Sequence, residues 1–228
     1  MSSYVSVKAG VRARESVYPR GVGWVAALPE PGLFIKRFTD VVVSGIALAG
    51  LSPMLAVIAA LVKLDSKGPA LYCGARVGKN GRIFNCCKFR TMVPGADRLQ
   101  EELRGRNERQ APCFKIADDP RITGIGGFLR RYSLDEVPQL WNVLKGEMSL
   151  VGPRPHPEAD CRRYVPEHWR RLEVTPGMTG LWQVTARSDP SFEKNMQLDL
   201  QYIEHWSLWL DFRILCKTLP VVLRGNGS

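Results

Sequence analysis

The sequence predicts a mainly helical α+β protein, in which a small domain carries an N-terminal membrane-embedded segment and a short β-hairpin. Three observations predict this fold class. Residues 41–62 contain no charged residue and are long enough to cross a bilayer. Residues 69–86 hold two short strand-like runs around a turn. After position 136, apolar residues recur at helical spacing. A length of 228 residues suits one domain with short appendages.

The apolar segment is expected to enter and leave the membrane by the same face. Basic residues lie on both sides of it, so the positive-inside rule gives neither flank a reason to cross. Ser52-Pro53 lies at its middle, where proline removes a backbone hydrogen bond and a serine hydroxyl can satisfy the freed carbonyl. We therefore expect a re-entrant helix-turn-helix over residues 33–64. A straight membrane-spanning helix and a buried helix of a soluble protein are the two alternatives.

Two further parts flank this segment. Residues 1–32 are rich in glycine and proline and are expected to form a mobile arm. Residues 65–228 form the folded domain, in which residues 69–73 and 82–86 are expected to pair as a hairpin around Gly78-Lys79-Asn80-Gly81. Residues 198–215 mix aromatic with acidic side chains, which indicates either an amphipathic interfacial helix or a helix whose aromatics fill the core.

Two adjacent carboxylates, Asp135 and Glu136, follow the basic pair Arg130-Arg131 and precede an apolar helical pattern. A helix is expected to begin near Pro138, whose missing N–H costs nothing in a first turn. Both carboxylates then lie at the positive end of this helix, which keeps a carboxylate ionised and attracts phosphate. An ionised aspartate can act as a nucleophile, and a neighbouring glutamate can hold a divalent cation. The pattern indicates a site that handles phosphate.

A structural interpretation of the same residues stays open at this point. Ser133-x-x-Glu136 fits a capping box, in which the serine and glutamate side chains each bond the other residue's backbone N–H. In that case Glu136 has only a structural role.

Two later stretches carry a family resemblance. They are GEMSLVGPRP at residues 146–155 and PGMTGLWQV at residues 176–184. Together with the Asp135-Glu136 pair, they resemble the bacterial sugar transferases, also called monotopic phosphoglycosyl transferases, in order from about residue 33 to about residue 223. The resemblance implies transfer of a sugar 1-phosphate from a UDP-sugar to polyprenol (undecaprenyl) phosphate, with release of UMP. This is the initiating step of exopolysaccharide or other surface glycan synthesis.

The resemblance also assigns roles. Asp135 matches the covalent nucleophile, and Glu136 matches the ligand of Mg²⁺, the expected cofactor. Ala186 stands where the family usually has a glycine before the arginine. Alanine allows fewer backbone conformations than glycine, so the loop at Arg187 is expected to be less free to adapt. The residues expected to contact the substrate are Lys88, Arg90, Arg121, Arg130, Pro153, Arg154 and Arg187. Asp118-Asp119 before Pro120 is interpreted as a turn and not as a metal site.

The expected partners follow from the same resemblance. They are a UDP-sugar, with UDP-glucose or UDP-galactose favoured, polyprenol phosphate, and the bacterial inner (cytoplasmic) membrane, with the catalytic domain on its cytoplasmic face. A homodimer is left open. A lipid-diphosphate phosphohydrolase and a non-catalytic membrane-binding protein are the alternative functions.

Charge and cysteine usage narrow the choice of partners and compartment. A net charge of +10 favours acidic partners such as anionic lipid, diphosphates or nucleic acid. The chain has no zinc-finger or RNA-binding motif, and its arginines cluster around proline-glycine loops, so no nucleic acid is expected. The six cysteines show no C-x-x-C spacing and are expected to be reduced thiols facing a cytosol.

Overall fold

The computed structural model describes residues 30–108, 116, 118–187 and 189–225. Most of the predicted N-terminal arm therefore lies outside the described residues. The fold is mainly helical with two small two-stranded sheets, in agreement with the predicted class. The elements in order are α1 (Glu30–Asp65), β1 (Leu71–Val77), η1 (Lys79–Gly81), β2 (Ile83–Phe89), α2 (Ala96–Glu102), η2 (Arg104–Arg106), α3 (Gly124–Arg131), η3 (Leu134–Gln139), α4 (Leu140–Lys145), β3 (Ser149–Val151), α5 (Glu158–Cys161), η4 (Pro166–Glu173), β4 (Gly177–Thr179), α6 (Leu181–Thr185), α7 (Phe192–Glu204) and α8 (Leu208–Leu223), where η marks a 3₁₀ helix.

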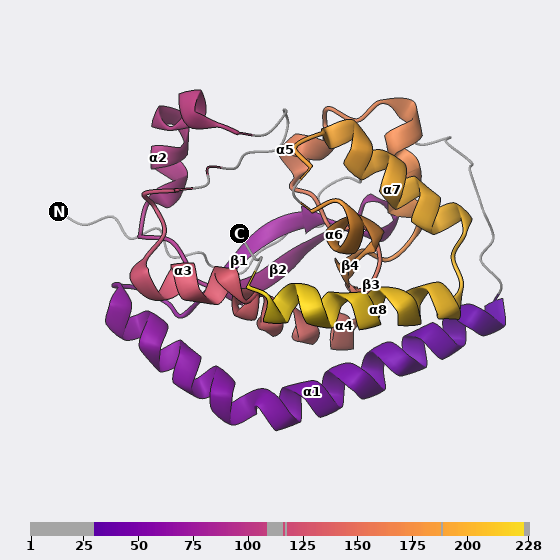
Figure 1. The fold of residues 1–228 in the computed structure, drawn as a ribbon, viewed down its shortest axis with the longest axis horizontal. Helices are drawn as coiled ribbons and strands as arrows, with labels where there is room; N and C mark the ends of the chain where they lie inside the picture. Colours follow the sequence, from indigo (N-terminus) through magenta and orange to yellow (C-terminus); the bar gives the residue numbers. More distant parts are fainter. Residues whose placement is uncertain (1–29, 109–115, 117, 188, 226–228) are drawn as a thin grey trace.

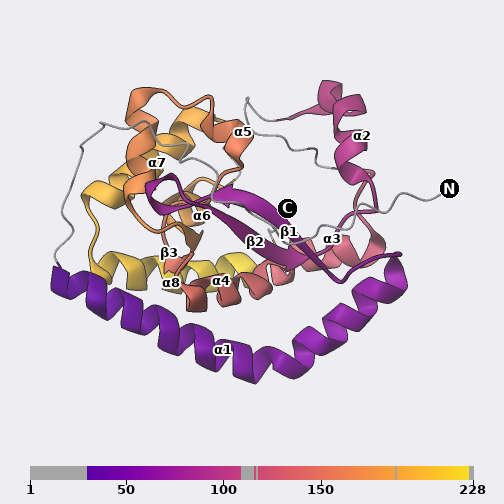
Figure 2. The same ribbon diagram turned by 180° about the vertical axis from the view of Figure 1, so that it is seen from behind.

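Helix α1 bows along one side of the molecule (Figure 1 and Figure 2). It is one helix that bends and continues through Pro53, whereas the sequence predicted a helix-turn-helix over residues 33–64. Pro53 has no N–H to offer the Ala49 carbonyl, and the Ser52 hydroxyl donates to that carbonyl instead, at 2.8 Å. Because the freed acceptor is satisfied within the helix, the proline bends the helix without ending it.

The N-terminal end of α1 is bound to the domain by its charged side chains. Lys36 Nζ donates to Asp211 Oδ2 at 2.6 Å. Arg37 Nη2 donates at 2.8 Å to the Leu144 carbonyl, in the last turn of α4. Asp40 Oδ1 accepts a backbone N–H of β3 at 2.9 Å. The two basic residues Lys36 and Arg37 before the apolar segment therefore attach the helix to the domain.

The C-terminal end of α1 is bound to the same domain. Asp65 Oδ2 accepts the Ile125 N–H, in the first turn of α3, at 3.1 Å. Arg90 Nη2 donates to the Ser66 carbonyl at 2.6 Å. Gly68 makes room for this arginine: its φ is +126°, and a Cβ there would lie 2.3 Å from Arg90 Nη1. Both ends of α1 thus meet one side of one domain, and the middle of the helix bows away from it (Figure 1).

Strands β1 and β2 form the predicted antiparallel hairpin, which extends beyond the predicted runs. Its register places Cys73 opposite Cys87, with their Cα atoms 4.1 Å apart, and the two form a disulfide. The expectation of six reduced thiols is therefore wrong for this pair. Sequence spacing gave no sign of it, because strand register creates the pairing. Among the residues that the structure describes, Cys86, Cys161 and Cys216 are free thiols.

The two motif stretches at residues 146–155 and 176–184 meet as the parallel strands β3 and β4. Immediately after β3, the backbones approach too closely for side chains. A Cβ on Gly177 would lie 2.0 Å from the Gly152 nitrogen. Only glycine at this contact allows the two loops to lie against each other.

Residues 198–215 divide between two environments. Helix α7 contributes the buried Tyr202 and Ile203 to the main core, which also includes residues of α4, β3 and α8. Helix α8 exposes Trp209 and Phe212, which are 65% and 54% accessible. The core interpretation is therefore confirmed for α7, and the exposed aromatic face expected of an interfacial helix is found on α8.

Candidate functional site

Asp135 and Glu136 lie in the first turn of η3, which leads directly into α4. The helix therefore begins before Pro138 and begins as a 3₁₀ helix. Ser133 precedes it in the left-handed conformation, with φ 55°, and makes no side-chain cap. The Glu136 carboxylate bonds Arg154 instead of reaching back to the serine. The capping box is not formed, which leaves Glu136 available for chemistry.

Glu136 and Arg154 form a two-point ion pair. Arg154 Nη1 donates to Oε2 at 3.1 Å, and Nη2 donates to Oε1. Burial alone would raise the pKa of Glu136. The charge and hydrogen bonds of Arg154, with the charges of Lys88 and Arg187, outweigh burial and hold that pKa below its usual value. Glu136 is therefore ionised at neutral pH.

Asp135 has the opposite environment, with only 5% of its surface accessible. Burial, and then the neighbouring charge of Glu136, raise its pKa above the usual value of an aspartate. Lys88, Arg130 and Arg154 act in the other direction without cancelling these effects. The dyad thus combines one strongly anionic carboxylate with one that is held in a poorly solvated position beside three cations.

Lys88 and Arg130 come from different elements. Lys88 lies on β2 opposite Tyr72, whose ring centroid is 6.0 Å from Nζ. Arg130 lies at the end of α3, and its Nε donates to Thr91 Oγ1 at 2.8 Å. Burial lowers the pKa of both groups, and the nearby Asp135 opposes that effect. Two partly desolvated cations therefore lie near the dyad, and both belong to the substrate contacts that the resemblance implies.

Two predicted phosphate contacts have other partners in the structure. Arg90 follows β2 and bonds the C-terminal carbonyls of α1. Arg121 is 4% accessible and forms a buried ion pair with Asp119, with Nη2 2.6 Å from Oδ2, and also donates to the Ala96 carbonyl. Its positive charge lies close enough to lower the pKa of Arg130, so Arg121 adds positive charge beside the site without a shown contact to the dyad. The turn interpretation of Asp119 is confirmed, because its side chain accepts the Arg121 N–H at 3.0 Å.

The remaining predicted residues lie on loops around the dyad. Pro153 is buried beside Arg154 in the loop after β3. Arg187 follows α6, and its charge acts on Glu136. Ala186, which replaces a glycine of the family pattern, has φ −140°. That φ lies outside the left-handed region that favours glycine, so the replacement does not require a conformation reserved for glycine.

Sequence reasoning missed two side chains of the site. Cys86 lies two residues before Lys88 on β2 and therefore on the same face of the strand, near Arg154 and Glu136. Its pKa is raised, first of all by burial, so it remains a thiol. Thr91 orients Arg130. The two-residue period of a strand was the signal available for Cys86, whereas nothing local marks Thr91.

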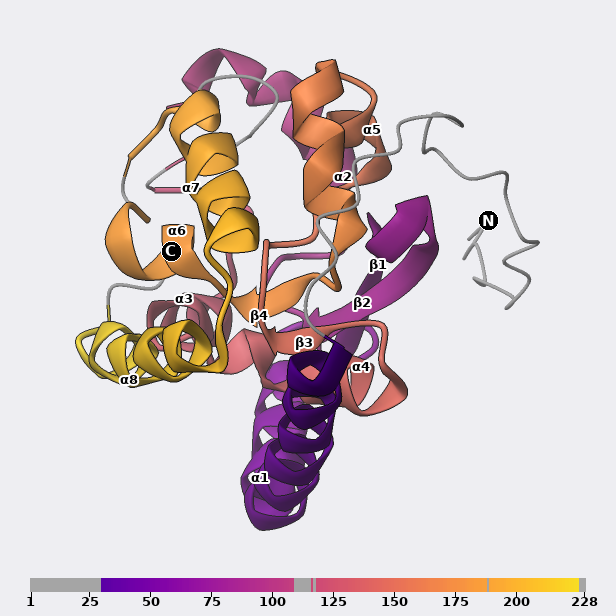
Figure 3. The ribbon, with the colours of Figure 1, turned by 90° about the vertical axis from the view of Figure 1, so that its right-hand side faces the viewer.

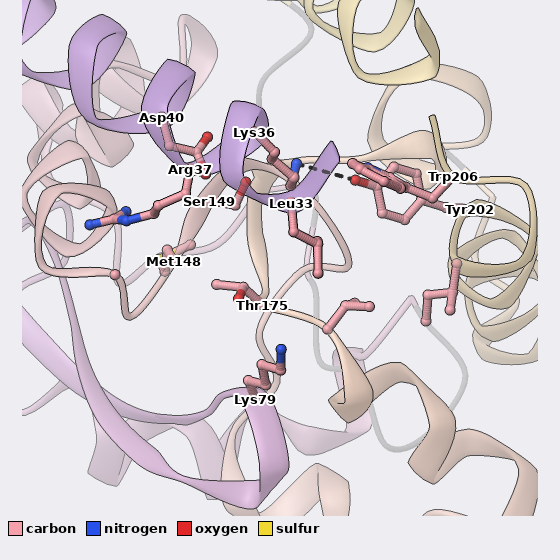
Figure 4. A pocket seen from close by; sticks show the side chains of 13 residues that line it. Leu33, Lys36, Arg37, Asp40, Lys79, Met148, Ser149, Thr175, Tyr202 and Trp206 are labelled. Atoms are coloured by element: carbon pink, nitrogen blue, oxygen red, sulfur yellow. Dashed lines mark hydrogen bonds between the residues drawn. The ribbon is translucent and has the colours of Figure 1, made fainter. Parts of the chain in front are cut away.

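A cavity of about 200 Å³ lies elsewhere, at the N-terminal end of α1 (Figure 4). Its lining includes Lys36, Arg37 and Asp40, which already attach α1 to the domain, together with apolar side chains such as Trp206. Neither dyad residue lines it. The arrangement of charged groups, and not the cavity, therefore identifies the candidate active site.

Comparison with known proteins identifies the family of the chain. A family model described as bacterial sugar transferase matches residues 32–225. The UDP-galactose-lipid carrier transferase of Erwinia amylovora is 46% identical over 199 residues, which cover 86% of this chain and 42% of that protein. The exopolysaccharide production protein ExoY of Rhizobium meliloti is 40% identical over 228 residues, which cover 97% of this chain and 100% of that protein. The undecaprenyl-phosphate galactose phosphotransferase of Salmonella typhimurium is 44% identical, and the chain covers 42% of its length. This chain belongs to the bacterial sugar transferase family.

Proposed function

We propose that the protein transfers a sugar 1-phosphate from a UDP-sugar to polyprenol phosphate, and that Asp135 carries the sugar phosphate between the two. The observation that carries the proposal is the environment of Asp135: a buried carboxylate beside Lys88, Arg130 and Arg154, next to the ionised Glu136. Reaction between a carboxylate and a diphosphate joins two anions, so such a cation cluster is what the chemistry requires.

The reaction proceeds in two displacements at one phosphorus. An Asp135 oxygen attacks the phosphorus that bears the sugar, the bond to UMP breaks, and UMP leaves with the electron pair. The lipid phosphate then attacks the same phosphorus, the bond to Asp135 breaks, and the free carboxylate is restored. The products are UMP and a polyprenyl-diphospho-sugar. One site used in turn by a soluble and a lipid substrate predicts ping-pong kinetics.

Mg²⁺ suits this site on the chemistry of its donors. The described residues contain no cluster of three or more His, Cys, Asp or Glu side chains that could hold a metal. Mg²⁺ commonly uses one or two carboxylates with water and substrate phosphates, so Glu136 beside a bound diphosphate is a sufficient protein contribution. When bound, Mg²⁺ would neutralise charge on the diphosphate. Arg154 forms an ion pair with Glu136 in this structure, and with Mg²⁺ on Glu136 its guanidinium would be available to bind the diphosphate.

The helix α1 and its surroundings support a monotopic arrangement. Residues Pro31–Asp65 form a helix long and apolar enough to cross a membrane. Both of its ends bond the same domain, so we propose that both ends lie at the same membrane face. Three further helices carry exposed large apolar side chains: Phe128 on α3, Trp141 on α4 and Trp209 on α8. These three helices lie at one level, on the side from which α1 projects (Figure 1 and Figure 3).

The names of relatives support the donor and acceptor classes. This chain spans about two-fifths of the length of the galactose-related relatives described above and all of the length of ExoY. A Caulobacter vibrioides relative, 39% identical, is named UDP-glucose:undecaprenyl-phosphate glucose-1-phosphate transferase. We therefore propose UDP-glucose or UDP-galactose as donor, in exopolysaccharide synthesis on the cytoplasmic face of the membrane.

The test is UMP release by the purified protein in detergent, with Mg²⁺, undecaprenyl phosphate and a panel of UDP-sugars. We expect release with one hexose donor, dependent on the lipid, and transfer of the labelled sugar into the organic phase. Sugar phosphate that stays in the aqueous phase and forms without lipid would identify water as the acceptor and a phosphohydrolase instead. A folded protein that releases no UMP with any donor would contradict the proposal and favour a non-catalytic membrane-binding protein.

A further inference from the structure

The loop that carries Arg154 to Glu136 has prolines on both sides of the arginine, Pro153 and Pro155. Proline has no N–H, so carbonyl groups are the main attachment points within this tripeptide. The Pro153 carbonyl accepts a backbone N–H of β4 at 2.9 Å. The Arg154 carbonyl is held by a side chain instead: Arg171 Nη2 donates to it at 2.8 Å.

Arg171 is itself fixed from several directions. It is 3% accessible, and Nη2 also donates to Asp199 Oδ2 at 2.5 Å. Its Nη1 donates to the Tyr164 hydroxyl, which lies 2.9 Å from His156 Nδ1. Burial, and then the charge of Arg171, lower the pKa of His156, so the ring is neutral and can accept the Tyr164 proton. A guanidinium held this way cannot shift without leaving a buried charge unpaired.

A neighbouring ion pair shows what is particular to Arg171. Arg170 Nη1 lies 2.8 Å from Glu204 Oε1 and joins η4 to α7 near the surface. Arg171 and Asp199 join the same two elements in the interior. Unlike Arg170, Arg171 also donates a hydrogen bond to the backbone of the loop that holds Arg154.

We propose that Arg171 is a positioning residue for sugar-phosphate transfer. With Asp199 as its fixed partner, it sets the place of the Arg154 backbone and thereby aims the Arg154 guanidinium at Glu136 and at the diphosphate of the donor. The inference rests on the proposed function, because the donor's diphosphate is the ligand that Arg154 would meet. A residue with only a structural role would affect activity whether or not Arg154 is present. Arg171 is expected to affect donor binding and turnover only through Arg154.

The experiment is a double-mutant cycle between Arg171→Lys and Arg154→Ala, read by kcat/KM for the donor and by the Kd of UDP alone. In the native background, Arg171→Lys is expected to lower kcat/KM and to weaken UDP binding, each by about 10- to 100-fold, because small displacements of a contact group are costly. In the Arg154→Ala background, the same substitution is expected to change both values by less than about 3-fold, because the group it positions is gone.

Arg170→Lys is the matched control, since it makes the same substitution in the other ion pair between η4 and α7. It is expected to leave both values within about 3-fold of the native protein. Tyr164→Phe is the second variant if Arg171→Lys does not fold. It removes one hydroxyl that holds Arg171 and keeps the ring, and it is expected to show a smaller loss that also disappears in the Arg154→Ala background.

An Arg171→Lys effect that persists at full size without Arg154 would overturn the proposal, as would folded Arg171→Lys with native values. A failure of the proposed function can be told apart from a failure of this inference. If the native protein releases no UMP, the transferase proposal is contradicted, and the UDP-binding cycle still decides whether Arg171 acts through Arg154.

Discussion

At the residue scale, the two carboxylates of the dyad are neighbours in sequence with opposite electrostatics. Arg154 holds Glu136 ionised, whereas burial and the charge of Glu136 work against ionisation of Asp135. An ionised Asp135 is therefore solvated less well than an aspartate in water, and the cations beside it keep that charged form accessible. This combination suits a carboxylate that must attack an anionic diphosphate.

The substitution Asp135→Asn is expected to abolish activity and to stabilise the protein. The folded pKa of Asp135 is raised above its unfolded value, so its ionisation costs stability as the pH rises through that folded pKa. At neutral pH the native protein carries this cost and the asparagine variant does not. We expect a higher Tm for the variant at neutral pH, a difference that shrinks on acidification, and UMP release reduced by about 10³-fold or more. A lower Tm at neutral pH would contradict this electrostatic account.

The cation Lys88 should control the acid side of the pH–rate profile. Its charge lowers the pKa of Asp135, so Lys88→Met is expected to raise that pKa and to shift the acid limb of the kcat/KM profile to higher pH. Lys79→Met, at the exposed turn of the same hairpin, is the control and should leave the profile in place. An unchanged acid limb in Lys88→Met would show that Asp135 does not determine it.

The sequence predicted the residue types of this site better than their partners. Asp135, Glu136, Lys88 and Arg130 come together as predicted. Arg90, two positions after Lys88, bonds the end of α1 instead. The partner of an arginine depends on contacts with distant parts of the chain, which no local pattern reports.

At the element scale, helix α1 shows why a proline pattern predicts a bend more reliably than a break. The sequence predicted a turn at Ser52-Pro53, and the helix continues because the serine hydroxyl satisfies the Ala49 carbonyl. The sequence contains both residues, but whether the hydroxyl compensates for the missing N–H depends on the rotamer it adopts within the folded helix.

The compensation at this bend can be measured with two substitutions. Ser52→Ala leaves the Ala49 carbonyl without its hydroxyl partner and is expected to cost about 0.5–1.5 kcal/mol. In a Pro53→Ala background the residue-53 N–H can bond that carbonyl, so Ser52→Ala should then cost almost nothing. The measurement is thermal unfolding of the four proteins in lipid nanodiscs. Equal costs in the two backgrounds would mean that the hydroxyl does not replace the proline's missing bond.

At the scale of the whole molecule, the attachments of α1 constrain its membrane topology. Lys36 and Arg37 bind one end to the domain, and Asp65 and Arg90 bind the other. A straight crossing would require one set of these bonds to break. These polar contacts are therefore the argument for the proposed re-entrant topology, which the apolar composition of the helix alone does not distinguish from a span.

Single cysteines at the two ends of α1 test this topology. Pro31→Cys and Lys67→Cys are expected to react with a membrane-impermeant maleimide from the cytoplasmic side only, in inverted vesicles and not in intact spheroplasts. The parent chain gives the background from its native thiols, including the exposed Cys216. Labelling of the two positions from opposite sides would establish a straight span.

The central claim of this account is that Asp135 carries the sugar phosphate as a covalent intermediate. The most direct measurement incubates the protein with the accepted UDP-sugar, radiolabelled in its β-phosphate, in the absence of lipid, followed by acid quench and peptide mapping. We expect label on the peptide that contains Asp135, a matching amount of UMP, loss of the label to added undecaprenyl phosphate, and no label in Asp135→Asn. Full turnover by the native protein without captured label, together with turnover by Asp135→Asn, would contradict it.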